Sequence, residues 1–164
     1  MAVDPKVSRA IMKVEVEAAI ELASTFGWIL CPDYEALTLR VLMTAHNGDR
    51  YVVDVELTDY REQPAAYDFA DRKTGIVGAA AAYPKGHDSF FNPNGPCICA
   101  PFNLKAYKRP GQRTGLHADW SIGDWANSNA QNFPWRDHAS ILGALMLIQT
   151  RLDRPALYLG RMSA

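Results

Sequence analysis

The sequence predicts an α+β fold, in which helices and strands occupy separate parts of the chain. Three patterns predict it: a helical pattern over about residues 5–26, two strand patterns around the turn Asn47-Gly48-Asp49, and a second helical pattern over about 137–152. Regular alternation of strands and helices, as in parallel α/β folds, is not found. At this length we expect a single domain that spans residues 1–164.

The first helix is predicted from Pro5 to Phe26. The Asp4 side chain can cap it, and Pro5 suits the first helical turn because the missing N–H has no partner there anyway. Apolar residues recur at spacings of three and four. They are Val7, Ile11, Val14, Ala18 and Leu22. We expect this stripe to face the core, and Gly27 to end the helix.

The next segment predicts an antiparallel hairpin. The runs Leu37 to Thr44 and Tyr51 to Thr58 both alternate apolar and polar residues, which is the period of a half-buried strand. An Asn-Gly pair lies between them and is a strong turn signal. A third short strand is expected around Ala66 to Phe69, where Tyr67 and Phe69 alternate.

The last predicted element is a helix from about Asp137 to Leu152. Four apolar residues at positions 141, 145, 148 and 152 share one helical face. Arg151 favours the C-terminal end through the helix dipole, and Pro155 prevents continuation.

Between these elements, residues 75–134 show no clear periodicity. Gly, Pro and Asn are frequent, yet the aromatic content is far above that of a disordered linker, so we expect an ordered irregular region. Long irregular stretches inside a compact domain are usually functional. We expect the tryptophans Trp120, Trp125 and Trp135 to serve packing.

Composition excludes several classes of protein. Lys+Arg 17 against Asp+Glu 18 gives a net charge of −1, which argues against a dedicated nucleic-acid binder. No apolar run approaches membrane-spanning length, and the N-terminus resembles no secretory signal, so we expect a soluble cytoplasmic protein. Three cysteines do not make a disulfide scaffold. Cys31 follows the apolar run Trp28-Ile29-Leu30, and we expect it to be buried and inert.

The other two cysteines lie in the segment most suggestive of chemistry. Cys97 and Cys99 occupy a Pro-flanked stretch beside several asparagines. A thiol nucleophile that forms acyl intermediates needs access for a carbonyl and donors for the oxyanion, and asparagine amides can supply them. Two alternatives stay open. Both cysteines can be small buried hydrophobes, or they can form a zinc site with His87 and His117, although a single C-x-C is a weak metal signal.

Several motifs in this order resemble the ubiquitin-conjugating E2 family in a divergent, prokaryotic form. Asn92-Pro93-Asn94 is similar to the His-Pro-Asn tripeptide of E2 enzymes, and Ile98-Cys99 is similar to the Ile-Cys of their active site. The Tyr60 to Pro64 turn and Phe133-Pro134-Trp135 before the last helix also fit the family order. The chain departs from the pattern at Asn92, which stands in place of the histidine.

The resemblance implies a UBC-like fold and transthioesterification without a cofactor or a metal. Cys99 would accept a ubiquitin-like protein from an E1-like adenylating enzyme and pass it to an amine or thiol, while Asn94 would stabilise the oxyanion. Cys97 is the alternative nucleophile. A catalytically silent E2-like module that binds a ubiquitin-like protein or an E1 is the alternative function. Prokaryotic relatives often accompany JAB-type peptidases, some in antiphage defence.

Other polar residues are candidate helpers. His117 would lower the thiol pKa or take a proton from the attacking amine, and Asp119 would orient it; turn-capping is the alternative for both. A basic stretch can dock an acidic partner surface or be simply solvated. It comprises Lys105, Lys108, Arg109 and Arg113.

Overall fold

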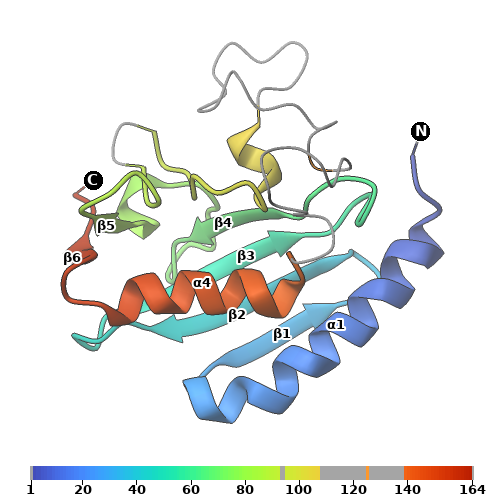
Figure 1. Cartoon of the computed structure of the whole chain (residues 1–164), viewed down its shortest axis with the longest axis horizontal. Coiled ribbons are helices and arrows are strands. Elements are labelled where there is room, and N and C mark those ends of the chain that lie inside the picture. The colour runs from blue at the N-terminus through green and yellow to red at the C-terminus, as the bar shows by residue number, and fades with distance from the viewer. Residues whose placement is uncertain (1, 93–94, 108–124, 126–138, 164) are drawn as a thin grey trace.

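The computed structural model describes residues 2–92, 95–107, 125 and 139–163. Its centre is a four-stranded antiparallel sheet in the order β1-β2-β3-β4, and a second, two-stranded sheet joins β5 to β6. Figure 1 shows α4 lying across the central sheet and α1 at the margin of the molecule beside β1. The elements are α1 (Pro5–Phe26), β1 (Ile29–Asp33), β2 (Thr38–Thr44), β3 (Arg50–Glu56), β4 (Ala66–Ala70), η1 (Ala80–Ala82), β5 (Pro84–Gly86), η2 (Leu104–Ala106), α4 (Ile141–Asp153) and β6 (Tyr158–Arg161). The α+β class is therefore confirmed.

Helix α1 has the predicted bounds, but its buried face differs from the predicted one. The Asp4 side chain accepts a hydrogen bond from the Lys6 amide, and Gly27 ends the helix with φ 67. The buried residues are Ser8, Met12, Val16 and Ala19. The prediction that the Val7–Leu22 stripe faces the core is wrong, because a second face with the same helical spacing packs inward. Its first member is a serine whose hydroxyl donates to the Tyr60 carbonyl, so the apolar pattern did not reveal it.

The predicted hairpin is confirmed as β2 and β3. Val41 pairs with Val53, and Leu39 pairs with Val55 across the ladder. The alternating apolar residues of the two runs are buried, as the alternation predicts, whereas Leu42 and Val52 on the other face are half-buried. Strand β4 extends the sheet at the predicted position, with Phe69 opposite Val53.

Strand β1 was not predicted, and it changes the placement of Cys31. Because β1 forms an outer strand of the sheet, its residues alternate between exposed and half-buried. Cys31 pairs with the exposed Arg40 and is itself exposed, so the expectation that it is buried is wrong. The apolar run before Cys31 leads into an edge strand, which packs with one face only.

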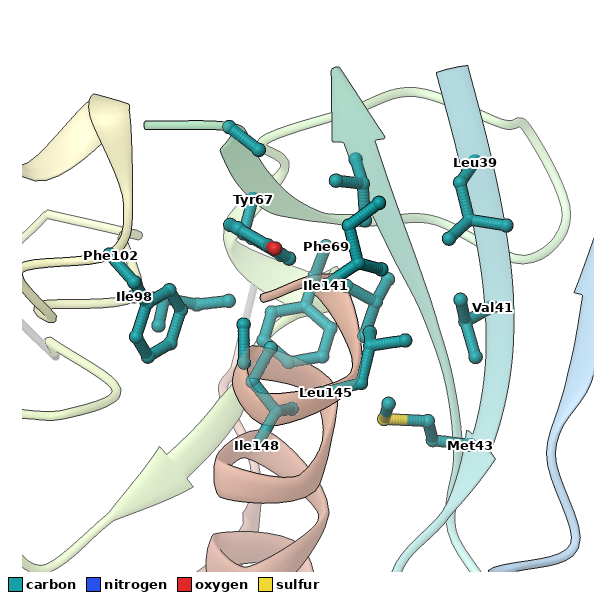
Figure 2. Close-up of a cluster of buried hydrophobic side chains, with 14 of the residues drawn as sticks. Leu39, Val41, Met43, Tyr67, Phe69, Ile98, Phe102, Ile141, Leu145 and Ile148 are labelled. Atoms are coloured by element: carbon teal, nitrogen blue, oxygen red, sulfur yellow. The ribbon is translucent and has the colours of Figure 1, made fainter. Parts of the chain in front are cut away.

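Helix α4 presents the predicted face to the sheet. Figure 2 shows Ile141, Leu145 and Ile148 directed toward the side chains of β2 and toward Phe69, and all are buried. The helix begins at Ile141, where the Ser140 hydroxyl accepts from the Gly143 amide at 3.0 Å. The helix therefore starts about one turn later than the expected start near Asp137: residues 139 and 140 are not helical, and 137 lies outside the described residues.

The chain after β4 is irregular and packs against the sheet edge. The Phe69 ring lies 5.0 Å from the ring of Tyr83 and 5.8 Å from that of Phe91, so this segment shares the main core. Trp125 is buried in the same core, as expected, although its indole N–H has no hydrogen-bond partner among the described residues. Trp120 and Trp135 lie outside the described residues. Among the helices that the structure describes, none has the length and apolar character that a membrane crossing requires.

Candidate thiol site

Cys97 and Cys99 lie on a tight loop, residues 90–99, which we call the thiol loop. Phe91 and Ile98 form an isolated antiparallel bridge. The Asn92 amide donates to the Cys97 carbonyl at 3.0 Å, and the Cys99 amide donates to the Phe90 carbonyl at 2.7 Å. The two arms of the loop are therefore held together on both sides of residues 93–94. These two residues, one of which is the predicted oxyanion donor Asn94, lie outside the described residues.

Cys97 is the buried thiol of the pair. Its residue is 7% exposed, and burial raises the pKa of the thiol to about 12. The nearby Asp68 carboxylate adds to this increase, whereas Lys105 opposes it. A thiol with such a pKa is protonated at neutral pH and is a poor nucleophile.

Cys99 is the more accessible thiol. It is half-buried, and desolvation raises its pKa above the ordinary value. None of the three cysteines, all of which the structure describes, forms a disulfide. Between the two candidate nucleophiles, accessibility therefore favours Cys99, although its thiol must lose a proton in the course of any reaction.

A buried carboxylate beside Cys97 is a feature that the sequence analysis missed. Asp68 lies on β4 and is almost fully buried. The Tyr83 hydroxyl and the Lys105 ammonium both donate to its carboxylate. Burial and this carboxylate raise the pKa of the Tyr83 hydroxyl far above its usual value. The available signal was an acid inside a strand whose other residues are all apolar or aromatic.

Lys105, predicted to bind a partner, is therefore engaged in an internal ion pair. Its side chain is 39% exposed, so the ammonium lies at the border between Asp68 and solvent. Its docking role stays a prediction. Lys108, Arg109 and Arg113 lie outside the described residues.

Asn103 connects the thiol loop to the sheet. Its buried amide nitrogen donates to the Ile98 carbonyl at 2.8 Å and approaches the Cys97 sulfur at 3.9 Å. Its side-chain oxygen accepts from the amides of Tyr67 at 2.8 Å and Lys105 at 3.1 Å. From the sequence, this residue is only one of several asparagines near the two cysteines. Because both polar atoms are occupied by the protein, its function is to position the loop.

The remaining predicted residues are not brought to this site in the described part of the chain. His117 and Asp119 lie outside it. His87 is exposed, and its backbone amide donates to the Leu157 carbonyl at 3.1 Å. No group of three or more potential metal-ligating side chains occurs among the described residues.

Comparison with known proteins identifies no similar protein. The sequence matches no protein-family model, and no match is found among curated proteins or solved structures. Functional inference therefore depends on the residues, their geometry and the resemblance noted above.

Proposed function

We propose that the protein is an E2-like carrier, with a UBC-like fold, that holds a ubiquitin-like protein as a thioester on Cys99. The observation that carries the proposal is an accessible thiol on a loop fixed to the sheet edge by its own backbone bonds and by Asn103. The order of helix, antiparallel sheet, cysteine segment and helix is also compatible with it. In the reducing cytoplasm, where we place the protein, such a thiol stays reduced.

The chemistry consists of two acyl transfers. The Cys99 thiolate attacks the thioester carbonyl on the E1-like enzyme, a C–S bond forms at Cys99, and the E1 cysteine leaves as a thiolate. An amine or thiol acceptor then attacks the Cys99 thioester, and Cys99 leaves as a thiolate. The proton lost from Cys99 and later from the acceptor passes to solvent or to a base; His117 and Asp119 are proposed for that task.

Charging of the protein tests this proposal. The chain is incubated with ATP, a cognate E1-like adenylating enzyme and its ubiquitin-like protein. We expect an adduct that a reducing agent removes, that Cys99→Ala abolishes, and that Cys99→Ser makes resistant to reduction. Cys97→Ala is the matched control and should still charge. Charging that persists in Cys99→Ala but is lost in Cys97→Ala would assign the nucleophile to Cys97, and retention of charging in both variants would refute a thioester on this loop.

A second candidate function is favoured by the pKa values of the two thiols. Burial raises the pKa of both Cys97 and Cys99, as expected of a non-catalytic module that binds a ubiquitin-like protein or an E1-like enzyme. Iodoacetamide labelling in a Cys31→Ser background separates the two candidates. Cys99 modification within minutes at neutral pH supports the carrier, whereas an unreactive pair in a folded chain supports the module. In either case we propose a JAB-type peptidase in the same pathway, and a role in antiphage defence.

A further inference from the structure

Helix α1 carries a second apolar face that the fold does not cover. Val7 is 50% exposed, Val14 is 68% exposed and Leu22 is 37% exposed. Ala18 is exposed between them, and Ile11 is only partly buried. These five residues, which we call the outer stripe, recur at helical spacing and form a continuous apolar strip. Figure 1 shows α1 at the margin of the molecule, where one of its sides faces away from the sheet.

The charges along α1 are divided between its two halves. Lys6 and Lys13 lie toward the N-terminal end, whereas Glu17 and Glu21 lie toward the C-terminal end. At 3.6 residues per turn, these four residues fall on the same flank of the outer stripe. The other charged side chains of α1 are used within the fold: Arg9 pairs with Glu35, and Glu15 pairs with Arg61, each at 2.9 Å.

The four flanking charges make no ion pair within the described part of the chain. Lys6, Glu17 and Glu21 are exposed, and the ammonium of Lys13 lies 5.6 Å from the centre of the Tyr34 ring. A positive half and a negative half on one exposed flank are therefore available to a partner. The partner that matches them must carry the same two charges in the opposite order along its length.

We propose that a second copy of this chain is that partner, and that two α1 helices pack antiparallel through their outer stripes. In a twofold dimer, the same patch on each subunit meets its copy, so residue i contacts j and j contacts i. An axis near Val14 brings Lys13 beside the partner's Glu17 and Lys6 beside the partner's Glu21. In a parallel twofold pair, this flank of one helix would face the opposite flank of the other, so the four charges would not meet their copies. Only the antiparallel arrangement brings the two charged flanks together with opposite charges paired.

The size of this contact sets its expected strength. Helix α1 has 22 residues and is about 33 Å long at 1.5 Å per residue. A single pair of such helices lies at the low end of the range for specific interfaces, so we expect a dimer that dissociates on dilution at roughly micromolar concentration. This inference is independent of the proposed thioester chemistry.

Sedimentation velocity over a concentration series tests the apolar part. In reducing buffer, we expect the wild-type chain to shift from monomer to dimer, and Val14→Glu to stay monomeric with at least a tenfold weaker association. Ile76→Glu is the matched control, because Ile76 is 60% exposed on a different surface, and it should dimerise like the wild type. A wild-type chain that is monomeric throughout overturns the proposal, and so does a dimer that Val14→Glu leaves intact.

Charge reversal tests the orientation. The variants Lys6→Glu/Lys13→Glu and Glu17→Lys/Glu21→Lys should each be monomeric alone, because each carries one sign along the whole flank. Mixed in equal amounts, they should form a heterodimer. A mixture of Lys6→Glu/Lys13→Glu with Glu56→Lys/Glu62→Lys, which gains the same charge on another surface, should form no heterodimer, because the second variant keeps the wild-type α1 and pairs only with itself. Helical circular dichroism confirms that each variant is folded. A mixture of the two α1 variants that stays monomeric while the wild type dimerises refutes the antiparallel pairing.

Discussion

The sheet with α4 and the thiol loop are held in place by different forces. Under α4, contact is almost wholly apolar: side chains from β2, β3 and the helix interdigitate and exclude water. The thiol loop also contributes Ile98 to that core, but its position depends on a few polar contacts, chiefly those of Asn103. The first region should therefore respond to changes in volume, and the second to the loss of single hydrogen-bond partners.

Removal of a large side chain at the boundary between the two regions should give the largest loss of stability. Phe69 is fully buried and its ring contacts those of Tyr51, Tyr83 and Phe91. We expect Phe69→Ala to lower the free energy of unfolding by about 3–5 kcal/mol, measured by urea denaturation. The exposed Ile76→Ala should change it by less than about 0.5 kcal/mol. A small effect of Phe69→Ala would show that the two regions do not share one core.

Alkaline pH should destabilise both regions through buried tyrosines. Burial raises the pKa of Tyr60 and Tyr67 in and beside the sheet, and of Tyr83 next to the thiol loop. The pKa of each tyrosine in the folded state lies above the unfolded value of about 10. The contribution of the buried tyrosine to the free energy of unfolding is therefore complete below pH 10 and is lost as pH rises. At one pH unit above 10, each tyrosine should reduce stability by about 1.4 kcal/mol.

Denaturation curves between pH 8 and 11 measure this loss, and phenolate absorbance reports which state ionises. In Tyr67→Phe and in Tyr83→Phe, the free energy of unfolding should fall less steeply with rising pH, because one ionising tyrosine has been removed. If stability declined with the same slope in both variants and in the wild type, the alkaline loss could not be assigned to these buried tyrosines.

Loss of the Asn103 side chain should affect the thiol loop selectively. Asn103→Ala leaves the buried Tyr67 amide and Ile98 carbonyl without their partner, so we expect a loss of about 1–3 kcal/mol. Hydrogen exchange should quicken at Tyr67 and Lys105, while the amides shared by β2 and β3 keep their protection. Asn47→Ala in the exposed hairpin turn is the control. Uniform loss of protection across the sheet would argue against separate control of the loop.

The smallest expected effect concerns the start of α4. Ser140→Ala removes the acceptor of the Gly143 amide, which should lower stability by about 1 kcal/mol. Ser89→Ala, at an exposed position outside any helix, should have no measurable effect on the melting temperature. Equal melting temperatures for the two variants would mean that the cap contributes nothing.

The elements whose burial follows one simple period could be predicted from the sequence. The alternation in the β2–β3 hairpin and the four-residue face of α4 both matched the structure, because the residues at the predicted spacing are the buried ones. Other apolar residues, such as Val52 and Leu147, lie off these faces. Helix α1 defeated the same reasoning because it has two apolar faces, and the face that packs inward begins with Ser8. Strand β1 was hidden because an apolar run does not show which of its sides is covered.

The candidate site was predictable only in its cysteines. The motif pointed to Cys97 and Cys99, but not to the polar groups around Cys97. These are Asp68, Asn103 and Lys105, which the fold gathers from β4 and from the segment around η2. The contacts of Asn103 with Tyr67 and of Lys105 with Asp68 join residues more than thirty positions apart. Local patterns do not encode them.

The exposed position of Cys31 has a practical consequence for this molecule in air. Two chains that meet through this surface thiol can oxidise to an intermolecular disulfide, with molecular oxygen taking up the two electrons and the two protons. The resulting covalent species would have the mass of the α1-paired dimer and yet would survive dilution. Samples kept without a reducing agent would therefore convert with age from a dilution-sensitive to a dilution-resistant dimer, and Cys31→Ser would not.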